Sequence, residues 1–99
     1  MGNTLKFAER QKDKLKKPQD YKVVLLNDDW TSMDFVVDIL KIIFHKNDQE
    51  AERTMLEVHR NGRGVAGVYT FDIARTKAEQ VHCLAAKKNF PLKCVLELA

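Results

Sequence analysis

The apolar positions of the chain form six clusters, and their spacing predicts three strands and three helices. Short apolar and β-branched runs predict strands at residues 21–26, 64–70 and 92–98. Apolar positions three to four residues apart predict helices from residue 33 to about 45–46, from 48 to 61, and from 71 to about 87–89. The order βααβαβ indicates an α+β domain, in which a three-stranded antiparallel sheet packs against three helices.

Polar residues at the boundaries support these elements. Thr31 or Ser32 is suited to cap the first helix, because a hydroxyl accepts a hydrogen bond from a free backbone N–H. Asn47 followed three residues later by Glu50 predicts a capping box at the start of the second helix. Gly62 is a typical stop for that helix, since glycine tolerates a left-handed backbone.

Composition and length describe one ordinary domain. The 99 residues are 44% hydrophobic and 31% charged, and no apolar run approaches the roughly 20 residues that a membrane-spanning helix needs. The N-terminus lacks the apolar region of a secretory signal, so we expect a cytoplasmic protein. In that compartment Cys83 and Cys94 are expected to be reduced thiols.

The net charge of +3 comes entirely from the start of the chain. Residues 1–20 carry six basic and three acidic side chains, and the remainder carries eleven of each. Few apolar positions occur there, so we interpret residues 1–19 as a flexible basic extension and residues 20–99 as the core domain. A small βααβαβ fold with a basic leader also permits an alternative, a ribosome-associated or RNA-binding module, whose binding would depend steeply on salt.

The stretch Asn27–Asp28–Asp29 is the strongest candidate for function. It follows a buried strand and precedes an apolar helix, which places two carboxylates and an amide at an edge of the fold. In an arbitrary protein such a stretch is more often a simple turn. The chain shows no nucleophile motif and no phosphate-binding loop, so we expect no enzyme activity. Its histidines and cysteines have no metal-ligand spacing, so we expect neither metal nor cofactor.

Four segments of the chain resemble the ClpS family, the adaptors of the bacterial N-degron pathway. The segments are YKVVLLNDDWTSMDFV at residues 21–36, MLEVH at 55–59, GVYT at 67–70 and TKAE at 76–79. They occur in the family's order and spacing, and the family has the same βααβαβ fold. The resemblance implies an adaptor that binds a free N-terminal Leu, Phe, Tyr or Trp of a substrate protein. Such an adaptor delivers the substrate to a ClpA- or ClpC-like AAA+ unfoldase for degradation by ClpP.

The resemblance also implies roles for individual residues. The set that binds the substrate's α-amino group is Asn27, Asp28, Asp29 and His59, with Asp28 adding to the negative field or shaping the turn. The apolar pocket for the first side chain is formed by Leu26, Thr31, Met33, Val36, Met55, Val58 and Leu92. Asp72 and Lys77 correspond to the surface that docks on the N-terminal domain of the ATPase. The chain departs from the family pattern at Ser32, where many members have proline, and at Trp30.

Overall fold

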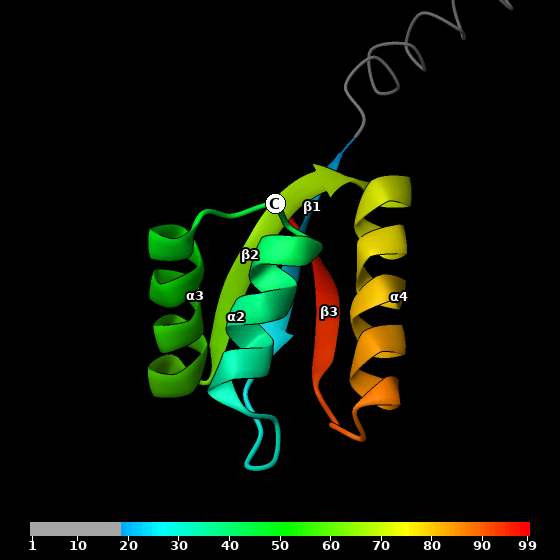
Figure 1. Cartoon of the computed structure of the whole chain (residues 1–99). Helices are drawn as coiled ribbons and strands as arrows, with labels where there is room; N and C mark the ends of the chain where they lie inside the picture. The colour runs from blue at the N-terminus through cyan, green and yellow to red at the C-terminus, as the bar shows by residue number, and fades with distance from the viewer. Residues whose placement is uncertain (1–18) are drawn as a thin grey trace, which may run out of the picture.

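The computed structural model describes residues 19–99, and its elements follow the predicted βααβαβ order (Figure 1). The sheet has the strand order β2–β1–β3, and both pairings are antiparallel, which confirms the predicted fold class. Apart from Gln19, the predicted basic extension lies outside the described residues. The elements are β1 (Asp20–Leu26), α2 (Met33–Ile42), α3 (Asp48–Asn61), β2 (Arg63–Thr70), α4 (Phe71–Lys87) and β3 (Lys93–Leu98).

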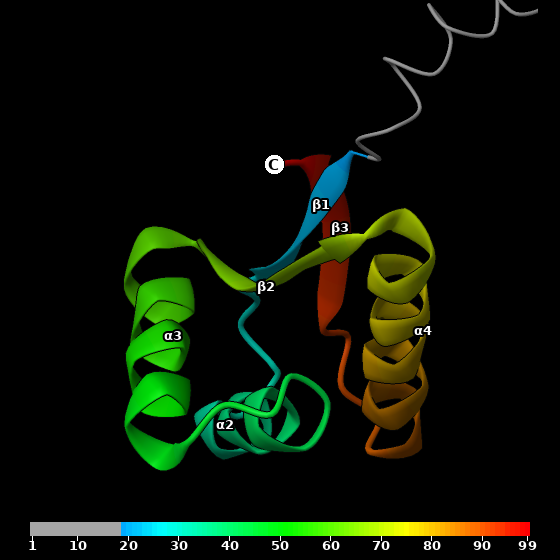
Figure 2. The same ribbon diagram turned by 90° about the horizontal axis from the view of Figure 1, so that it is seen from above.

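The three helices cover one face of the sheet, with α2 lying between α3 and α4 (Figures 1 and 2). Val23 and Leu25 of β1 point toward the helices and are fully buried in the core. Val24 points to the opposite face, and its exposed fraction is also 0%. On that face Arg63 of β2 and Glu97 of β3 form an ion pair of 2.6 Å between Nη2 and Oε1. Because β1 separates these two strands, the ion pair spans the central strand.

Helix α2 ends earlier than the sequence pattern predicts. The expected end was near His45–Lys46, whereas the helix stops at Ile42 with Ile43 as its C-cap. His45 has a left-handed backbone with φ of 57°, which no α-helix can continue through. The apolar pattern continues to residue 44 because Ile43 and Phe44 are buried in the turn that follows the helix.

The ends of α3 agree with the prediction. Asn47 and Glu50 form the capping box, with the Glu50 backbone N–H donating to Asn47 Oδ1 at 2.8 Å. Gly62 ends the helix in a left-handed conformation with φ of 88°. Two residues later, a Cβ at Gly64 would lie 2.8 Å from Cγ2 of Val58 and 3.2 Å from the carbonyl oxygen of Thr54. Gly64 therefore permits α3 to pack closely against β2.

Candidate functional site

A cavity of about 270 Å³ opens where the end of β1, the start of α2 and the C-terminal half of α3 meet. Its size lies just below the roughly 300–1,000 Å³ of sites for drug-sized molecules, so it suits one side chain and its neighbouring polar group. The cavity is lined by Asn27, Asp28, Asp29, Thr31, Met33, Val36, Met55, Val58 and His59.

A backbone hydrogen bond brings the two sides of the cavity together. The N–H of Asn27 donates to the carbonyl oxygen of Gly62 at 2.9 Å. Gly62 is the residue after α3, and His59 lies in the last turn of that helix. The left-handed turn at Gly62 and this one bond therefore place the end of β1 beside His59.

The carboxylate of Asp28 organises the loop between β1 and α2. Its Oδ1 accepts hydrogen bonds from the backbone N–H groups of Trp30 at 2.8 Å and Thr31 at 2.7 Å, and its Oδ2 accepts from the Thr31 hydroxyl at 2.8 Å. Burial raises the pKa of Asp28, but these hydrogen bonds outweigh it and hold the pKa below its usual value. Ser32 then begins α2, because its hydroxyl accepts from the N–H of Phe35 at 3.1 Å.

The lining of the cavity combines a polar rim with an apolar floor. Val36, Met55 and Val58 are buried members of the core, whereas Met33 is 44% exposed and stands at the edge. The nine lining residues include two aspartates and neither lysine nor arginine. The rim therefore offers hydrogen-bond acceptors and a negative field, which suit an ammonium group, and the floor suits an apolar side chain.

All four predicted amine-site residues and five of the seven predicted pocket residues line this cavity, and Leu26 and Leu92 do not. Leu26 points to the face of the sheet opposite the helices, because Leu25 occupies the inward position and successive side chains of a strand alternate. Leu92 is 3% exposed and belongs to the core cluster, as Val36, Met55 and Val58 do, but it is not among the residues that line the cavity. For Leu26 and Leu92 the place in the pocket stays a prediction.

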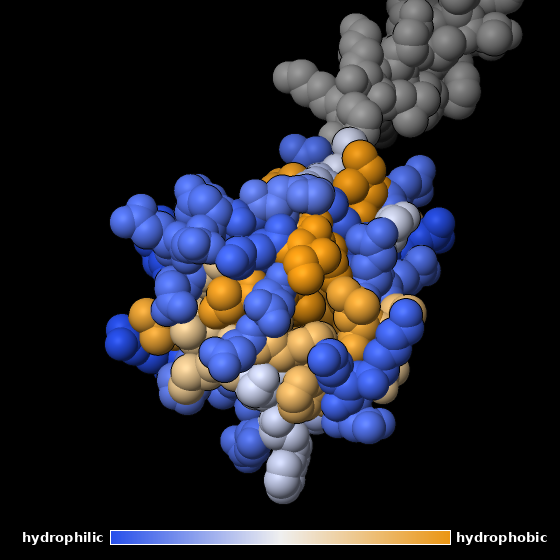
Figure 3. All heavy atoms as spheres, in the orientation of Figure 1, coloured by the Kyte–Doolittle hydropathy of each residue, from blue (hydrophilic) through white to orange (hydrophobic). Residues whose placement is uncertain are grey.

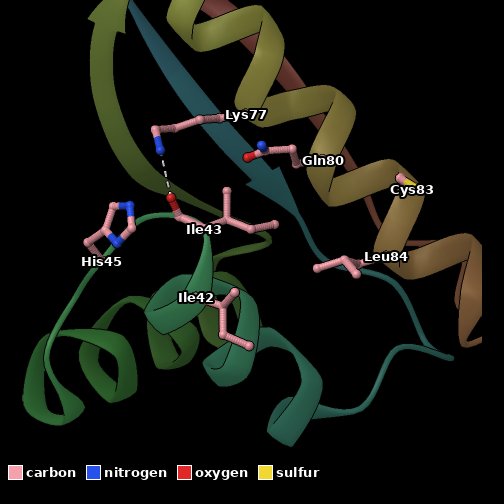
Figure 4. Close-up of a pocket in the computed structure, with 7 residues that line it drawn as sticks. All are labelled: Ile42, Ile43, His45, Lys77, Gln80, Cys83 and Leu84. Atoms are coloured by element: carbon pink, nitrogen blue, oxygen red, sulfur yellow. Dashed lines mark hydrogen bonds between the residues drawn. The ribbon is translucent and has the colours of Figure 1, made fainter.

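The two residues of the predicted docking surface lie in different environments on α4. Asp72 is exposed in the first turn of the helix. Lys77 is partly buried, and its Nζ donates to the carbonyl oxygen of Ile43 at 2.7 Å (Figure 4). The same Nζ lies 5.3 Å from the centre of the Tyr69 ring. Asp72 and Lys77 are five positions apart on α4, which corresponds to a rotation of roughly 140° about the helix axis. Their side chains therefore point in different directions.

Lys77 also borders an apolar hollow that the sequence pattern did not predict. The hollow lies between the end of α2 and the middle of α4, where apolar surface gathers in Figure 3. Ile42 is 64% exposed, but in the sequence it looks like any other apolar residue of a helix, so the pattern gives no sign of the hollow. The residues that line the hollow are Ile42, Ile43, His45, Lys77, Gln80, Cys83 and Leu84 (Figure 4).

Residues 19–99 show neither a cluster of metal ligands nor a membrane-spanning helix. Within this part of the chain, no three His, Cys, Asp or Glu side chains gather in the way that a metal ion requires. None of the helices described there has both the length and the apolar composition to cross a membrane. Both cysteines are free thiols, Cys83 at the surface and Cys94 buried.

Comparison with known proteins identifies the family. The family model described as "ATP-dependent Clp protease adaptor protein ClpS" matches residues 16–95 of the 99. The chain belongs to the ClpS family. It is accordingly an adaptor of the Clp protease rather than an enzyme, which supports the adaptor interpretation over the alternative of an RNA-binding module.

Individual ClpS relatives are similar over most of their length. The ClpS adapter protein of Acetivibrio thermocellus is 60% identical over 82 residues, which cover 83% of each chain. That of Paraburkholderia xenovorans is 58% identical over 91 residues, which cover 92% of this chain and 88% of the relative. The solved structure of Agrobacterium tumefaciens ClpS2 bound to L-phenylalaninamide matches with a TM-score of 0.81 and 40% identity, covering 84% of this chain and all of that one.

Proposed function

We propose that the cavity binds the free N-terminal residue of a substrate protein, and that the chain delivers this substrate to the Clp protease in the cytoplasm. The observation that carries the proposal is one cavity with a rim of acceptors above an apolar floor. L-phenylalaninamide, the ligand of the Agrobacterium relative, has the two groups that such a cavity suits, a free amine and an aromatic side chain.

In this proposal the rim holds the α-ammonium group. Asn27 supplies an amide oxygen, Asp29 a carboxylate, and His59 an imidazole nitrogen when neutral, while Asp28 acts mainly through the loop that it organises. A hydrogen bond to a charged group contributes roughly 1.5–3 kcal/mol. Loss of one rim partner should therefore weaken binding by about tenfold or more.

The floor receives the first side chain, which we propose is Leu, Phe, Tyr or Trp. Burial of such a side chain contributes roughly 1.5–3 kcal/mol, so floor and rim are of comparable weight. Met33 stands at the edge of the cavity and is partly exposed. Its flexible thioether adapts to side chains that are unbranched at Cβ and crowds Val and Ile, which explains the proposed preference.

Delivery requires a second surface, and we propose that α4 docks on the N-terminal domain of a ClpA- or ClpC-like ATPase. Asp72 is exposed and available for a charged partner. The ammonium group of Lys77 is bonded to Ile43, so its contribution is to fix the end of α2 against α4 as well as to present a positive charge. The proposed docking surface therefore includes the end of α2.

A peptide titration tests the substrate half of the proposal. The full chain is titrated against peptides that begin with Phe or Leu and carry a fluorophore at the C-terminus, and binding is followed by anisotropy. We expect micromolar or tighter binding that N-acetylation abolishes and that Asp29→Asn weakens by about tenfold. Glu57→Gln is the matched control, because Glu57 is an exposed acid of α3 that does not line the cavity. Equal binding of free and acetylated peptides would disprove the amine site.

A further inference from the structure

A second hollow of about 300 Å³ lies beside the proposed cavity, across the loop between β1 and α2 that protrudes at the bottom of Figure 1. Asn27 and Asp28 line both spaces. The second hollow thus adjoins the rim, although the proposed binding of the first residue does not use it. Its lining residues are Leu26, Asn27, Asp28, Trp30, Pro91 and Lys93.

The walls of this second hollow are mainly apolar. Leu26 and Pro91 supply aliphatic surface, and Trp30 supplies an indole that is 75% exposed. An exposed aromatic of this size beside a polar rim is typical of a contact surface. The hydrogen bond from the Trp30 N–H to Asp28 Oδ1 fixes the backbone of this residue, so the indole has a defined anchor.

We propose that the second hollow takes the side chain of the substrate's second residue and selects for an apolar one. This inference rests on the proposed function. A bound substrate must leave the cavity past the rim, because only its first residue fits inside. In an extended peptide successive side chains point in opposite directions, so a first side chain on the cavity floor directs the second out of the cavity, over the loop on whose other side the second hollow lies. Asn27 and Asp28, shared by both spaces, mark the place where the peptide crosses.

The chemistry of the hollow predicts which second residues are favoured. Leucine or phenylalanine would bury apolar area against Trp30 and Leu26, whereas glycine would bury none. Affinity should therefore be higher for a Phe-Leu peptide than for a Phe-Gly peptide.

A comparison of two peptides and three proteins tests the inference. Phe-Leu and Phe-Gly peptides of otherwise identical sequence are titrated against the wild-type full chain, Trp30→Ala and Leu98→Ala. Leu98 is the matched control, since it is also an exposed apolar residue and it lines neither space. We expect Phe-Leu to bind about fivefold more tightly than Phe-Gly in the wild type and in Leu98→Ala, and the ratio to fall to nearly one in Trp30→Ala.

Fluorescence gives an independent readout, because Trp30 is the sole tryptophan of the chain. At saturation, the emission of Trp30 should shift further to the blue with the Phe-Leu peptide than with the Phe-Gly peptide. A Phe-Leu to Phe-Gly ratio that is unchanged in Trp30→Ala, or equal emission with both peptides, would overturn the inference. Those outcomes leave the proposed function intact as long as Phe-Gly still binds and its acetylated form does not.

Discussion

Two substitutions of Asp28 distinguish a residue that shapes the loop from one that contacts the substrate amine. The carboxylate accepts three hydrogen bonds, all from its own loop, and Oδ1 serves both backbone N–H groups. Asp28→Ala removes all three acceptor contacts. Asp28→Asn removes the negative charge but keeps one oxygen for the two N–H groups, and its amide is able to donate to the Thr31 hydroxyl.

The size of each effect follows from these contacts. A hydrogen bond contributes about 0.5–1.5 kcal/mol net, and the exposed bond to Trp30 belongs at the low end, so Asp28→Ala should destabilise the loop by about 2 kcal/mol. A bound peptide needs the loop in place, so this loss raises the Kd by about 30-fold. Asp28→Asn keeps the loop, so we expect its Kd to stay within about threefold of wild type.

Anisotropy titration with a Phe peptide measures the Kd of each variant, and urea unfolding measures the stability of the whole domain. Asp29→Asn serves as the comparison for a direct amine contact, with an expected loss of about tenfold. If Asp28→Asn loses as much affinity as Asp28→Ala while its unfolding midpoint stays at the wild-type value, the charge of Asp28 acts on the amine and the loop argument is wrong.

Three further predictions concern stability and reactivity. The loop's hydrogen bonds lower the pKa of Asp28, so the ionised carboxylate should stabilise the fold fully above about pH 4. This stabilisation should disappear as the pH falls through the lowered pKa of Asp28. The difference in unfolding free energy between wild type and Asp28→Asn, measured with urea, should therefore shrink in acid. Gly64→Ala should cost about 1–3 kcal/mol in urea unfolding and weaken peptide binding, because the new methyl group pushes Val58 and the α3 backbone away from β2; wild-type values for both would contradict this packing. Burial raises the pKa of Cys94 to about 11, so iodoacetamide at pH 8 should label Cys83 alone in the native chain and both cysteines in urea, as mass spectrometry would show.

Local signals in the sequence were sufficient to predict most element boundaries. The capping box of Asn47 and Glu50 and the stop at Gly62 depend on residues within one turn of each other, and both are present. The end of α2 was misplaced because Ile43 and Phe44 continue the apolar spacing after the helix has stopped. Lys77 of α4 helps to hold that turn by donating to the carbonyl oxygen of Ile43. The two residues are 34 positions apart, so no local pattern in the sequence predicts the contact.

The same limit applies to Leu26 and Leu92, the two predicted pocket residues that do not line the cavity. Val23, Val24 and Leu25 of β1 are all fully buried, so the strand shows no alternation from which to tell which way Leu26 points. On the second face, Val24 lies between two strands whose residues Arg63 and Glu97 form an ion pair although they are distant in sequence. The rim residues were easier to predict, because turn residues that follow directly after a strand lie at the edge of the fold whatever the sheet order is.

Rim and floor of the cavity are held by different parts of the structure, and substitutions in them should therefore behave differently. Val36, Met55 and Val58 belong to the hydrophobic core, so altering the floor removes folding energy together with affinity. Asn27 and Asp29 are exposed and lie outside the strands and helices. Their side chains can change without a loss of core packing. Substitutions at Asn27 or Asp29 should therefore lower the affinity for the amine and leave the unfolding midpoint nearly constant. Substitutions in the floor should change the side-chain preference and the unfolding midpoint together.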